Sequence, residues 1–299
     1  MPSQDASVPA RREEPPAPRD GATTPVPRSE SALLANRATV LGLARLSPRR
    51  LFATAGLDLY RHIARLTDLR PEVEFVVAPC GRGMTAQFLC ATTGAAGAGV
   101  DPDPEVIEVA TARAKEARLS ARLHYEQGRL DDLPYQDGVF DVAIGEVGLA
   151  AAENPAAAVA ELVRVTKPMG TVVLIEFIWT GNVPAKRREE LAASLGVRPL
   201  LLVEWKQLLR DAGVVDLYVE DWSDAGASLR QPWPFGALAE IRSLRDWLVM
   251  CYRAWRRWGR SGLSLALRAR SEIRSLVAQE RILGLSLIKG TKWPDSPGR

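Results

Sequence analysis

The chain has 299 residues, of which 46% are hydrophobic and 25% are charged, as expected for a globular domain in water. Its formal net charge of +3 is too small to indicate a nucleic-acid partner by itself. Three scattered cysteines and two histidines cannot form a metal centre with ordinary ligand spacing, so we expect no metal and a reducing, cytoplasmic setting.

Residues 1–47 are rich in Pro, Ala, Ser, Arg and Glu and poor in large apolar side chains. Such a segment buries too little apolar surface to offset its ordering entropy, so we expect a disordered N-terminal tail. It lacks the basic and then apolar pattern of a signal peptide. The longest apolar stretch, around 172–180, is interrupted by Glu176 and is too short to cross a bilayer. One folded domain is therefore predicted over residues 48–299.

The folded domain begins with a helix-like segment that has Leu59 and Ile63 at helical spacing. Strand-like and helix-like segments then alternate. Strands are predicted at 73–78, 96–101, 122–126, 139–145 and 171–178, and helices at 83–93, 103–117 and 155–166. Continuous apolar strands that alternate with helices predict an α/β fold with a Rossmann-like, doubly wound, mostly parallel sheet.

The C-terminal part of the chain has a different pattern. A helix is predicted at 203–212, where Gly213 would cap its end, and a strand follows at 214–222. Residues 237–280 predict two helices broken near 259–262, and a final strand follows at 281–293. We expect the 237–280 insertion to form a helical cap over the open end of the sheet.

The segment FVVAPCGRGMTAQFL, residues 75–89, joins the first predicted strand to the next helix through a G-x-G-x-x-A turn. Gly81 and Gly83 let the backbone turn tightly and let a ligand approach closely. The start of the following helix offers free N–H groups to an anionic group. Short glycine turns also serve packing alone, so this is either a nucleotide-binding loop or an ordinary strand-to-helix turn.

Asp101 ends the next predicted strand, 20 residues after Gly81. A carboxylate at this position can accept hydrogen bonds from both hydroxyls of a ribose, although it can also act as a helix N-cap. The loop and the acid together fit either an NAD(P)-dependent oxidoreductase or an enzyme that uses S-adenosylmethionine (SAM), because both ligands carry an adenosine ribose.

Residues 128–177, GRLDDLPYQDGVFDVAIGEVGLAAAENPAAAVAELVRVTKPMGTVVLIEF, help to separate these ligands. They contain an acidic turn with Leu133-Pro134, a D-x-x-F-D strand entry at 137–141 and a V-x-K-P-x-G turn at 165–170. In this order the motifs resemble the second half of a class I SAM-dependent methyltransferase domain, closest to the small-molecule, quinone- and sterol-type branch. The resemblance covers about residues 73–222 and the last strand. It implies a methyltransferase with SAM as cofactor and a small, apolar or lipid-like acceptor.

The resemblance also implies a cofactor site. In that family, the cofactor-binding residues face the methionine part of SAM, take the ribose hydroxyls, lie beside the adenine or lie where sulfonium and substrate meet. The matching positions in this sequence are Pro79, Gly81, Gly83, Asp101, Pro102, Leu130 and Gly145. Glu146, at the end of the fourth strand, is the candidate catalytic base for a hydroxyl, thiol or carbon-acid substrate, and Glu176 is a weaker candidate.

The sequence departs from the family pattern at two acidic positions. Val77 stands where an acid usually supports the loop and the methionine amine, and Pro79 removes an N–H donor nearby. Arg129 stands where an acid usually accepts from the adenine amino group, and an arginine can only donate. Two lost contacts of about 1 kcal/mol each would weaken SAM binding about tenfold to thirtyfold. The departures leave three alternatives: modest affinity, a substitute contact from Asp131 or Asp132, or a degenerate fold that acts as a binding or scaffold protein.

Residues 240–260 predict a helix with one broad apolar face and many arginines on the rest. The pattern fits a cap that lines the active site, a basic amphipathic helix in peripheral contact with a membrane, or a packed helix with a solvated basic face. No nucleic-acid partner is expected, because the sequence contains no separate RNA-binding module.

Overall fold

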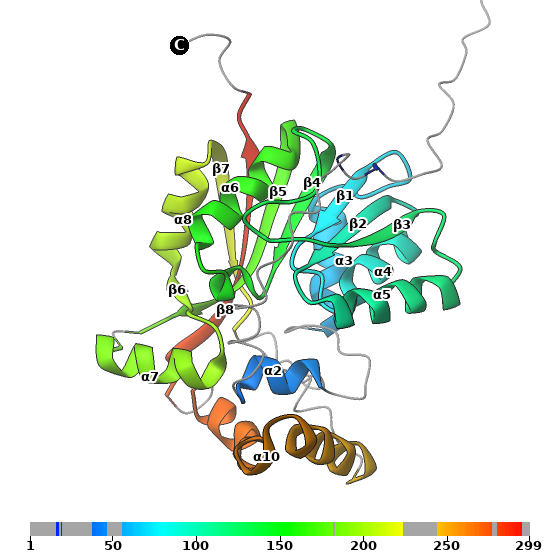
Figure 1. Cartoon of the computed structure of the whole chain (residues 1–299). Coiled ribbons are helices and arrows are strands. Elements are labelled where there is room, and N and C mark those ends of the chain that lie inside the picture. The colour runs from blue at the N-terminus through cyan, green and yellow to red at the C-terminus, as the bar shows by residue number, and fades with distance from the viewer. Residues whose placement is uncertain are drawn as a thin grey trace, which may run out of the picture.

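The computed structural model of the chain describes residues 16, 17, 19, 38–46, 56–181, 183–223, 244–276 and 280–294. Its centre is an 8-stranded sheet in the order β3-β2-β1-β4-β5-β8-β7, with β6 paired to β5 (Figure 1). The strands are β1 Glu74–Val77, β2 Ala96–Asp101, β3 Leu123–Gln127, β4 Phe140–Glu146, β5 Thr166–Trp179, β6 Leu200–Leu201, β7 Val214–Asp221 and β8 Leu283–Lys292. The predicted Rossmann-like sheet is confirmed.

Among the strands that the structure describes, only β8 runs against its neighbours: it is antiparallel to both β5 and β7, whereas the other pairs are parallel. The carboxyl ends of β1, β2, β4, β5 and β7 therefore meet at one edge of the sheet. In open sheets of this kind, ligands bind outside the carboxyl ends of the strands.

Helices cover the sheet and its carboxyl edge (Figure 1). They are α2 Val40–Arg45, α3 Gly56–Leu66, α4 Met84–Thr93, α5 Pro104–Glu116, α6 Pro155–Val165, α7 Ala185–Leu195, α8 Leu202–Asp211 and α10 Leu244–Arg274, with a 3-10 turn η1 at Leu149–Ala151. The helices predicted at 83–93, 103–117, 155–166 and 203–212 match α4, α5, α6 and α8. Helix α7 was not predicted, because its mostly polar sequence shows little periodicity.

Small residues in β2 set the spacing beneath the loop. A Cβ added at Gly97 would lie 2.4 Å from the ring of Phe75, and one added at Gly99 would lie 2.5 Å from the ring of Tyr125. Each glycine therefore leaves the space that an aromatic ring on a neighbouring strand fills. This packing brings β1, β2 and β3 together where the loop leaves β1.

Helix α2 departs from the prediction of a tail without structure over 1–47. Val40 and Leu43 are fully buried, and a Cβ at Gly42 would lie 3.2 Å from the ring of Trp258 on α10. A few apolar residues suffice here because a distant helix supplies the surface that buries them. The remainder of the predicted tail, apart from residues 16, 17 and 19, lies outside the described residues.

Helix α10 agrees with the predicted break in the C-terminal helices. Gly259 has φ 62° and ψ −140°, which interrupts the helix between Leu244 and Arg274. The helix packs against α2, and both lie beyond the edge where the parallel strands end (Figure 1). Residues 237–243 and 277–279 of the predicted 237–280 cap lie outside the described residues.

Candidate cofactor and active site

The loop between β1 and α4 turns through the two predicted glycines. Gly81 has φ 50° and Gly83 has φ 75°, both in the left-handed region that favours glycine. The Gly81 N–H donates to Oδ2 of Asp101 over 2.9 Å, and the Cys80 N–H donates to the Val100 carbonyl over 2.8 Å. The loop is thus fastened to the end of β2.

The two glycines have different surroundings. A Cβ at Gly83 would lie 2.4 Å from the hydroxyl oxygen of Tyr125, which donates to the Gly83 carbonyl over 2.8 Å. A Cβ at Gly81 would meet no atom within 4 Å. Gly83 is therefore a packing position, whereas Gly81 presents open backbone that a ligand can approach.

Asp101 is fully buried at the end of β2. Besides Gly81, its carboxylate accepts from the Asp103 N–H through Oδ1 over 3.0 Å. The N-cap of α5 is Asp103, which accepts from the Glu105 N–H over 3.0 Å. Asp103, and not Asp101, is therefore the N-cap of α5. Each oxygen of a carboxylate can accept more than one hydrogen bond, so these two contacts of Asp101 do not exclude a ribose.

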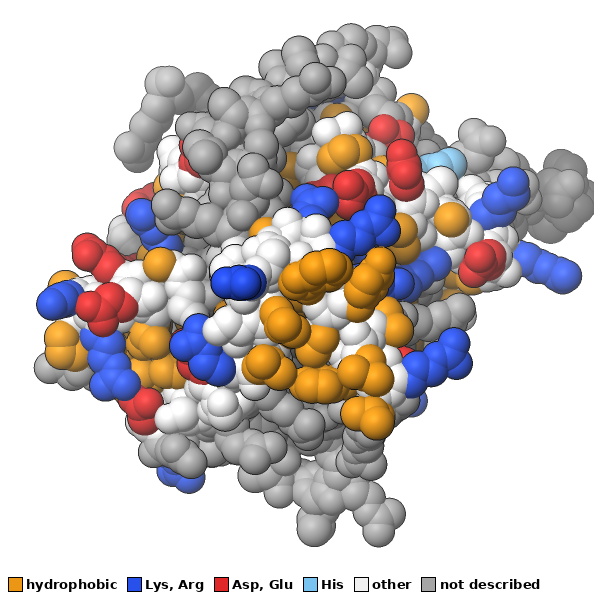
Figure 2. All heavy atoms as spheres, turned by 60° about the horizontal axis from the view of Figure 1, so that its bottom comes forward, with side chains coloured by type: hydrophobic (Ala, Val, Ile, Leu, Met, Phe, Trp, Pro, Cys, Tyr) orange, Lys and Arg blue, Asp and Glu red, His pale blue; other side chains and the backbone are white. Residues whose placement is uncertain are grey.

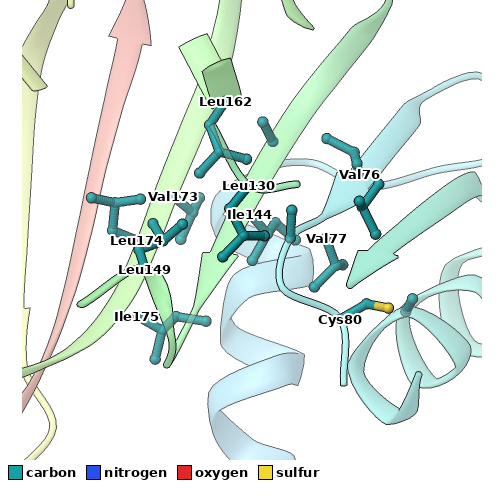
Figure 3. Close-up of a cluster of buried hydrophobic side chains, with 14 of the residues drawn as sticks. Val76, Val77, Cys80, Leu130, Ile144, Leu149, Leu162, Val173, Leu174 and Ile175 are labelled. Carbon is teal, nitrogen blue, oxygen red and sulfur yellow. The ribbon is translucent and has the colours of Figure 1, made fainter. Parts of the chain in front are cut away.

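Pro79 and Gly145 both have packing roles in this structure. The Ala78–Pro79 bond is cis, and a Cβ at Gly148 would lie 2.7 Å from Cγ of Pro79, so the ring packs on the turn after β4. A Cβ at Gly145 would lie 2.5 Å from Leu149 and 2.8 Å from Leu174. These leucines belong to the apolar cluster beneath the site (Figure 3).

Leu130 and Pro102 are the two residues predicted to lie beside the adenine. Leu130 is 9% exposed and joins the same apolar cluster (Figure 3), while the carbonyl of Pro102 accepts from the side-chain amide of Gln127 over 3.3 Å. Nearby, Arg129 forms two hydrogen bonds to Asp131, of 2.8 and 2.6 Å. These bonds hold the pKa of Asp131 below its ordinary value. Arg129 therefore occupies one acceptor position on each oxygen of Asp131, and a substitute contact from Asp131 or Asp132 to the adenine stays a prediction.

Glu146 ends β4 and is almost fully buried. It accepts a hydrogen bond from the hydroxyl of Tyr60 on α3 and another from the hydroxyl of Thr85 in the first turn of α4. Burial raises the pKa of Glu146, although both hydrogen bonds favour its ionised form. A carboxylate that accepts bonds from two helices in this way is fixed in position beside the loop.

Glu176 on β5 is a second buried carboxylate close to the first. One of its oxygens accepts from the N–H groups of Gly148 and Leu149, over 3.2 and 3.0 Å. Burial raises the pKa of Glu176 to about 8, and the nearby charge of Glu146 acts in the same direction. Two buried acids whose proton affinities are raised are typical of functional sites, although they also occur in purely structural networks.

A further polar cluster lies at the carboxyl end of β7. Glu220 is 2.9 Å from Nε2 of His62 on α3 and accepts from the Tyr218 hydroxyl over 2.6 Å and the Trp222 indole over 2.9 Å. Despite partial burial, which opposes ionisation, these donors and the His62 ring hold the pKa of Glu220 below its ordinary value.

Sequence reasoning missed Tyr60, Thr85 and Glu220 as members of this edge. Tyr60 and Thr85 occur on ordinary helices without a motif, and Glu220 lies 158 residues from its partner His62. Only the meeting of α3 with the strand ends shows their contacts. Among the described residues, no group of three or more His, Cys, Asp or Glu side chains could hold a metal ion. In the same residues, no helix is both long and apolar enough to cross a membrane.

Comparisons with known proteins agree with this geometry. The family described as "Methyltransferase domain" matches residues 77–174. The chain is 33% identical over 79 residues to the ubiquinone/menaquinone biosynthesis C-methyltransferase of Geobacter sp. (strain M21). The aligned region covers 26% of this chain and 34% of that protein. It is 25% identical over 209 residues to the sterol 24-C-methyltransferase of Aspergillus fumigatus. Here the aligned region covers 67% of this chain and 54% of that protein.

Among solved structures, the phosphoethanolamine N-methyltransferase 2 of Haemonchus contortus in complex with S-adenosyl-L-methionine superposes with a TM-score of 0.67. The sequences are 13% identical over 89% of this chain and 60% of that chain, so this likeness concerns the fold. The chain spans about half or less of the length of the curated relatives it matches. Residues 77–174 match the methyltransferase domain family, and the sheet order and the loop that Asp101 holds agree with the fold of class I SAM-dependent methyltransferases, which supports S-adenosylmethionine as the cofactor of this domain.

Proposed function

We propose that this chain transfers the methyl group of SAM to a small, apolar or lipid-like acceptor molecule. The observation that carries the proposal is the open backbone at Gly81, held by Asp101, on the same edge of the sheet as the buried carboxylates of Glu146 and Glu176. A backbone that can hold the cofactor and two buried carboxyl groups that can exchange a proton therefore share one edge of the sheet.

Four residues are assigned to hold the cofactor. In this assignment the Gly81 backbone faces the methionine part, Asp101 accepts from the ribose, and Pro102 and Leu130 flank the adenine. The fit is supported by the empty space at Gly81 and by the hydrogen bond that holds the Gly81 N–H to Asp101.

Glu146 offers a replacement for the acid that the sequence lacks at Val77. Val77 is fully buried and pairs with Gly99 and Ile144 in the sheet, so it contributes no polar group to the loop. Glu146 instead reaches the first turn of α4 through its hydrogen bond with Thr85. We assign to Glu146 the support of the loop and of the methionine amine, in addition to its candidate role as a base.

The chemistry requires little from the protein beyond alignment and the exclusion of water. When bound, SAM supplies an electrophilic methyl group. The chain's own residues hold the acceptor in line with that group, and a carboxylate with raised pKa takes the proton that a hydroxyl or carbon acid releases. Glu146 suits this task because Tyr60 and Thr85 fix its orientation and burial raises its proton affinity.

An apolar acceptor is favoured by the surroundings of this carboxylate. The ring of Tyr60, which donates to Glu146, has its centroid 6.0 Å from that of Phe88. The apolar residue Leu149 begins the 3-10 turn η1, three residues after Glu146. The Geobacter relative is named for ubiquinone/menaquinone biosynthesis and the Aspergillus relative for sterol methylation, and we propose an acceptor of this apolar class for this chain.

Calorimetric titration with SAM, S-adenosylhomocysteine and NADPH tests the proposal. We expect heat and a thermal shift with SAM and S-adenosylhomocysteine and none with NADPH. Absence of both signals with SAM up to millimolar concentration would contradict methyl transfer and favour the alternative of a degenerate scaffold. Binding of NADPH alone would favour an oxidoreductase.

A further inference from the structure

Helix α10 carries an exposed row of large apolar side chains that the fold does not use. Leu244, Leu248, Tyr252 and Trp255 are 53–70% exposed, although each is bulky and apolar or aromatic. Their spacings of four, four and three residues place them on one side of the helix. These four residues are called the apolar stripe below.

The apolar stripe is separate from the face that anchors α10 to the protein. Met250, Cys251 and Ala254 are buried, and Trp258 packs against Gly42 of α2. The helix is therefore already anchored without the apolar stripe. Exposed apolar residues occur singly on most proteins, but a contiguous row of this kind marks an interaction site.

Exposed arginines accompany the apolar stripe on α10. Arg256 follows Tyr252 by four residues and lies next to the stripe, while Arg253 and Arg257 are exposed further round the helix and Arg260 is exposed past the break at Gly259. Between Leu244 and Arg274 the sequence has eight arginines, two acidic residues and no lysine. Figure 2 shows hydrophobic side chains gathered on this face of the molecule beside Lys and Arg side chains.

The helix lies beside the cofactor end of the sheet. Arg257 is 3.7 Å from the carboxylate of Glu105, which belongs to the first turn of α5, four residues after Asp101. Leu46, which follows α2, accepts a hydrogen bond from Arg253 over 3.1 Å. The apolar stripe therefore belongs to the structure that covers the carboxyl edge of the sheet.

We infer that α10 docks on the surface of a bilayer that contains anionic phospholipids. An apolar stripe with Trp and Tyr, on a helix that also carries exposed arginines, is the pattern of a helix that lies in the membrane interface. The arginines complement anionic headgroups, and the apolar stripe enters the boundary of the acyl chains. A nucleic acid would engage the arginines but leave the apolar stripe in water, so it fits the surface less well.

This inference goes beyond the methyl-transfer proposal and does not require it. If both hold, the docked face would let an apolar acceptor pass from the bilayer toward the carboxyl edge of the sheet without crossing water. Membrane binding is measured without SAM or turnover, so failure of one proposal does not imply failure of the other.

Flotation of the purified full chain with phosphatidylcholine vesicles, with and without phosphatidylglycerol, tests the inference. We expect the protein to float with the anionic vesicles and to be released as salt rises. L248Q/W255Q should weaken vesicle binding at least about tenfold through lost apolar burial. R256Q/R260Q should weaken it about tenfold to thirtyfold and reduce its salt dependence.

Two controls use exposed residues of α8, away from this face. Val203→Gln removes an apolar side chain that is 64% exposed, and Arg210→Gln removes one positive charge; neither should change flotation. Failure of the wild-type chain to float with anionic vesicles overturns the inference, as does flotation that both α10 double variants leave intact. Light scattering that shows a dimer, which L248Q/W255Q converts to a monomer, assigns the apolar stripe to a second copy of the chain and also overturns it.

Discussion

The hydroxyl of Tyr60 on α3 donates a hydrogen bond to the carboxylate of Glu146 at the end of β4, which links two residues 86 positions apart. Both side chains are buried, so water does not compete for this contact. The bond joins α3 to the strand end that carries the candidate base. It is the contact that most directly connects the stability of α3 to the chemistry proposed for the site.

Tyr60→Phe should destabilise the protein by about 1.5–3 kcal/mol, because it leaves a buried carboxylate with one donor fewer. Tyr135→Phe is a matched control. The Tyr135 hydroxyl is also buried but finds no partner among the described residues, so its removal should be neutral or stabilising. Urea unfolding of both variants measures the difference. Equal losses in the two variants would show that the Tyr60–Glu146 bond contributes nothing specific.

Glu146→Gln distinguishes loop support from base catalysis. If Glu146 supports the methionine amine, its neutral amide should weaken SAM binding about tenfold, a loss of about 1.4 kcal/mol, by calorimetry. If Glu146 acts only as a base, SAM affinity should stay unchanged while turnover falls. Glu189→Gln on the exposed face of α7 is the control and should change neither quantity.

Asp101→Asn should weaken SAM binding at least tenfold, because the amide replaces one acceptor oxygen with a donor facing the Gly81 N–H or the ribose. Asp103→Asn serves as the comparison, since asparagine caps helices as well as aspartate and α5 should remain intact. Calorimetry with SAM separates the two variants. Unchanged affinity in Asp101→Asn would refute the ribose assignment.

Gly81→Ala and Gly83→Ala should behave differently although both have positive φ. Gly83→Ala brings a methyl group 2.4 Å from the hydroxyl oxygen of Tyr125, so it should lower the melting temperature clearly more than Gly81→Ala. Gly81→Ala meets open space and should cost only about 1–2 kcal/mol of backbone strain, while it blocks the approach of SAM. A folded Gly81→Ala variant that binds SAM normally would contradict the proposed contact.

Glu176 should make stability depend on pH. Burial raises its pKa from an ordinary 4.5 to about 8, so the folded protein holds a proton that the unfolded chain releases. The contribution is complete below pH 4.5 and is lost as pH rises to 8, at up to about 1.4 kcal/mol per pH unit. Glu176→Gln should remove this slope, because an amide does not titrate. The fold should be kept, because the amide oxygen still accepts from Gly148 and Leu149. Urea unfolding of the wild-type chain and of Glu176→Gln at pH 5, 6.5 and 8 measures the slope. If Glu176→Gln keeps the slope of the wild-type chain, another group binds the proton.

The sequence by itself determined the sheet, the loop and the acid at the end of β2. Apolar runs such as 139–145 and the turn at Gly81 and Gly83 depend on local backbone preferences, which a linear pattern carries. The distinction between the two glycines did not follow from the motif, because it depends on the ring of Tyr125 from another strand.

Only the tertiary structure decided which side chains meet at the carboxyl edge. Tyr60, Thr85 and Glu146 come from three elements, and no spacing in the sequence relates them. Burial decided the rest: Glu176 has a raised pKa because the fold removes it from water, and α2 is helical because α10 covers it. Local propensity is a property of neighbouring residues, whereas desolvation and hydrogen-bond partners depend on segments that are far apart in the chain and meet only when the sheet is formed.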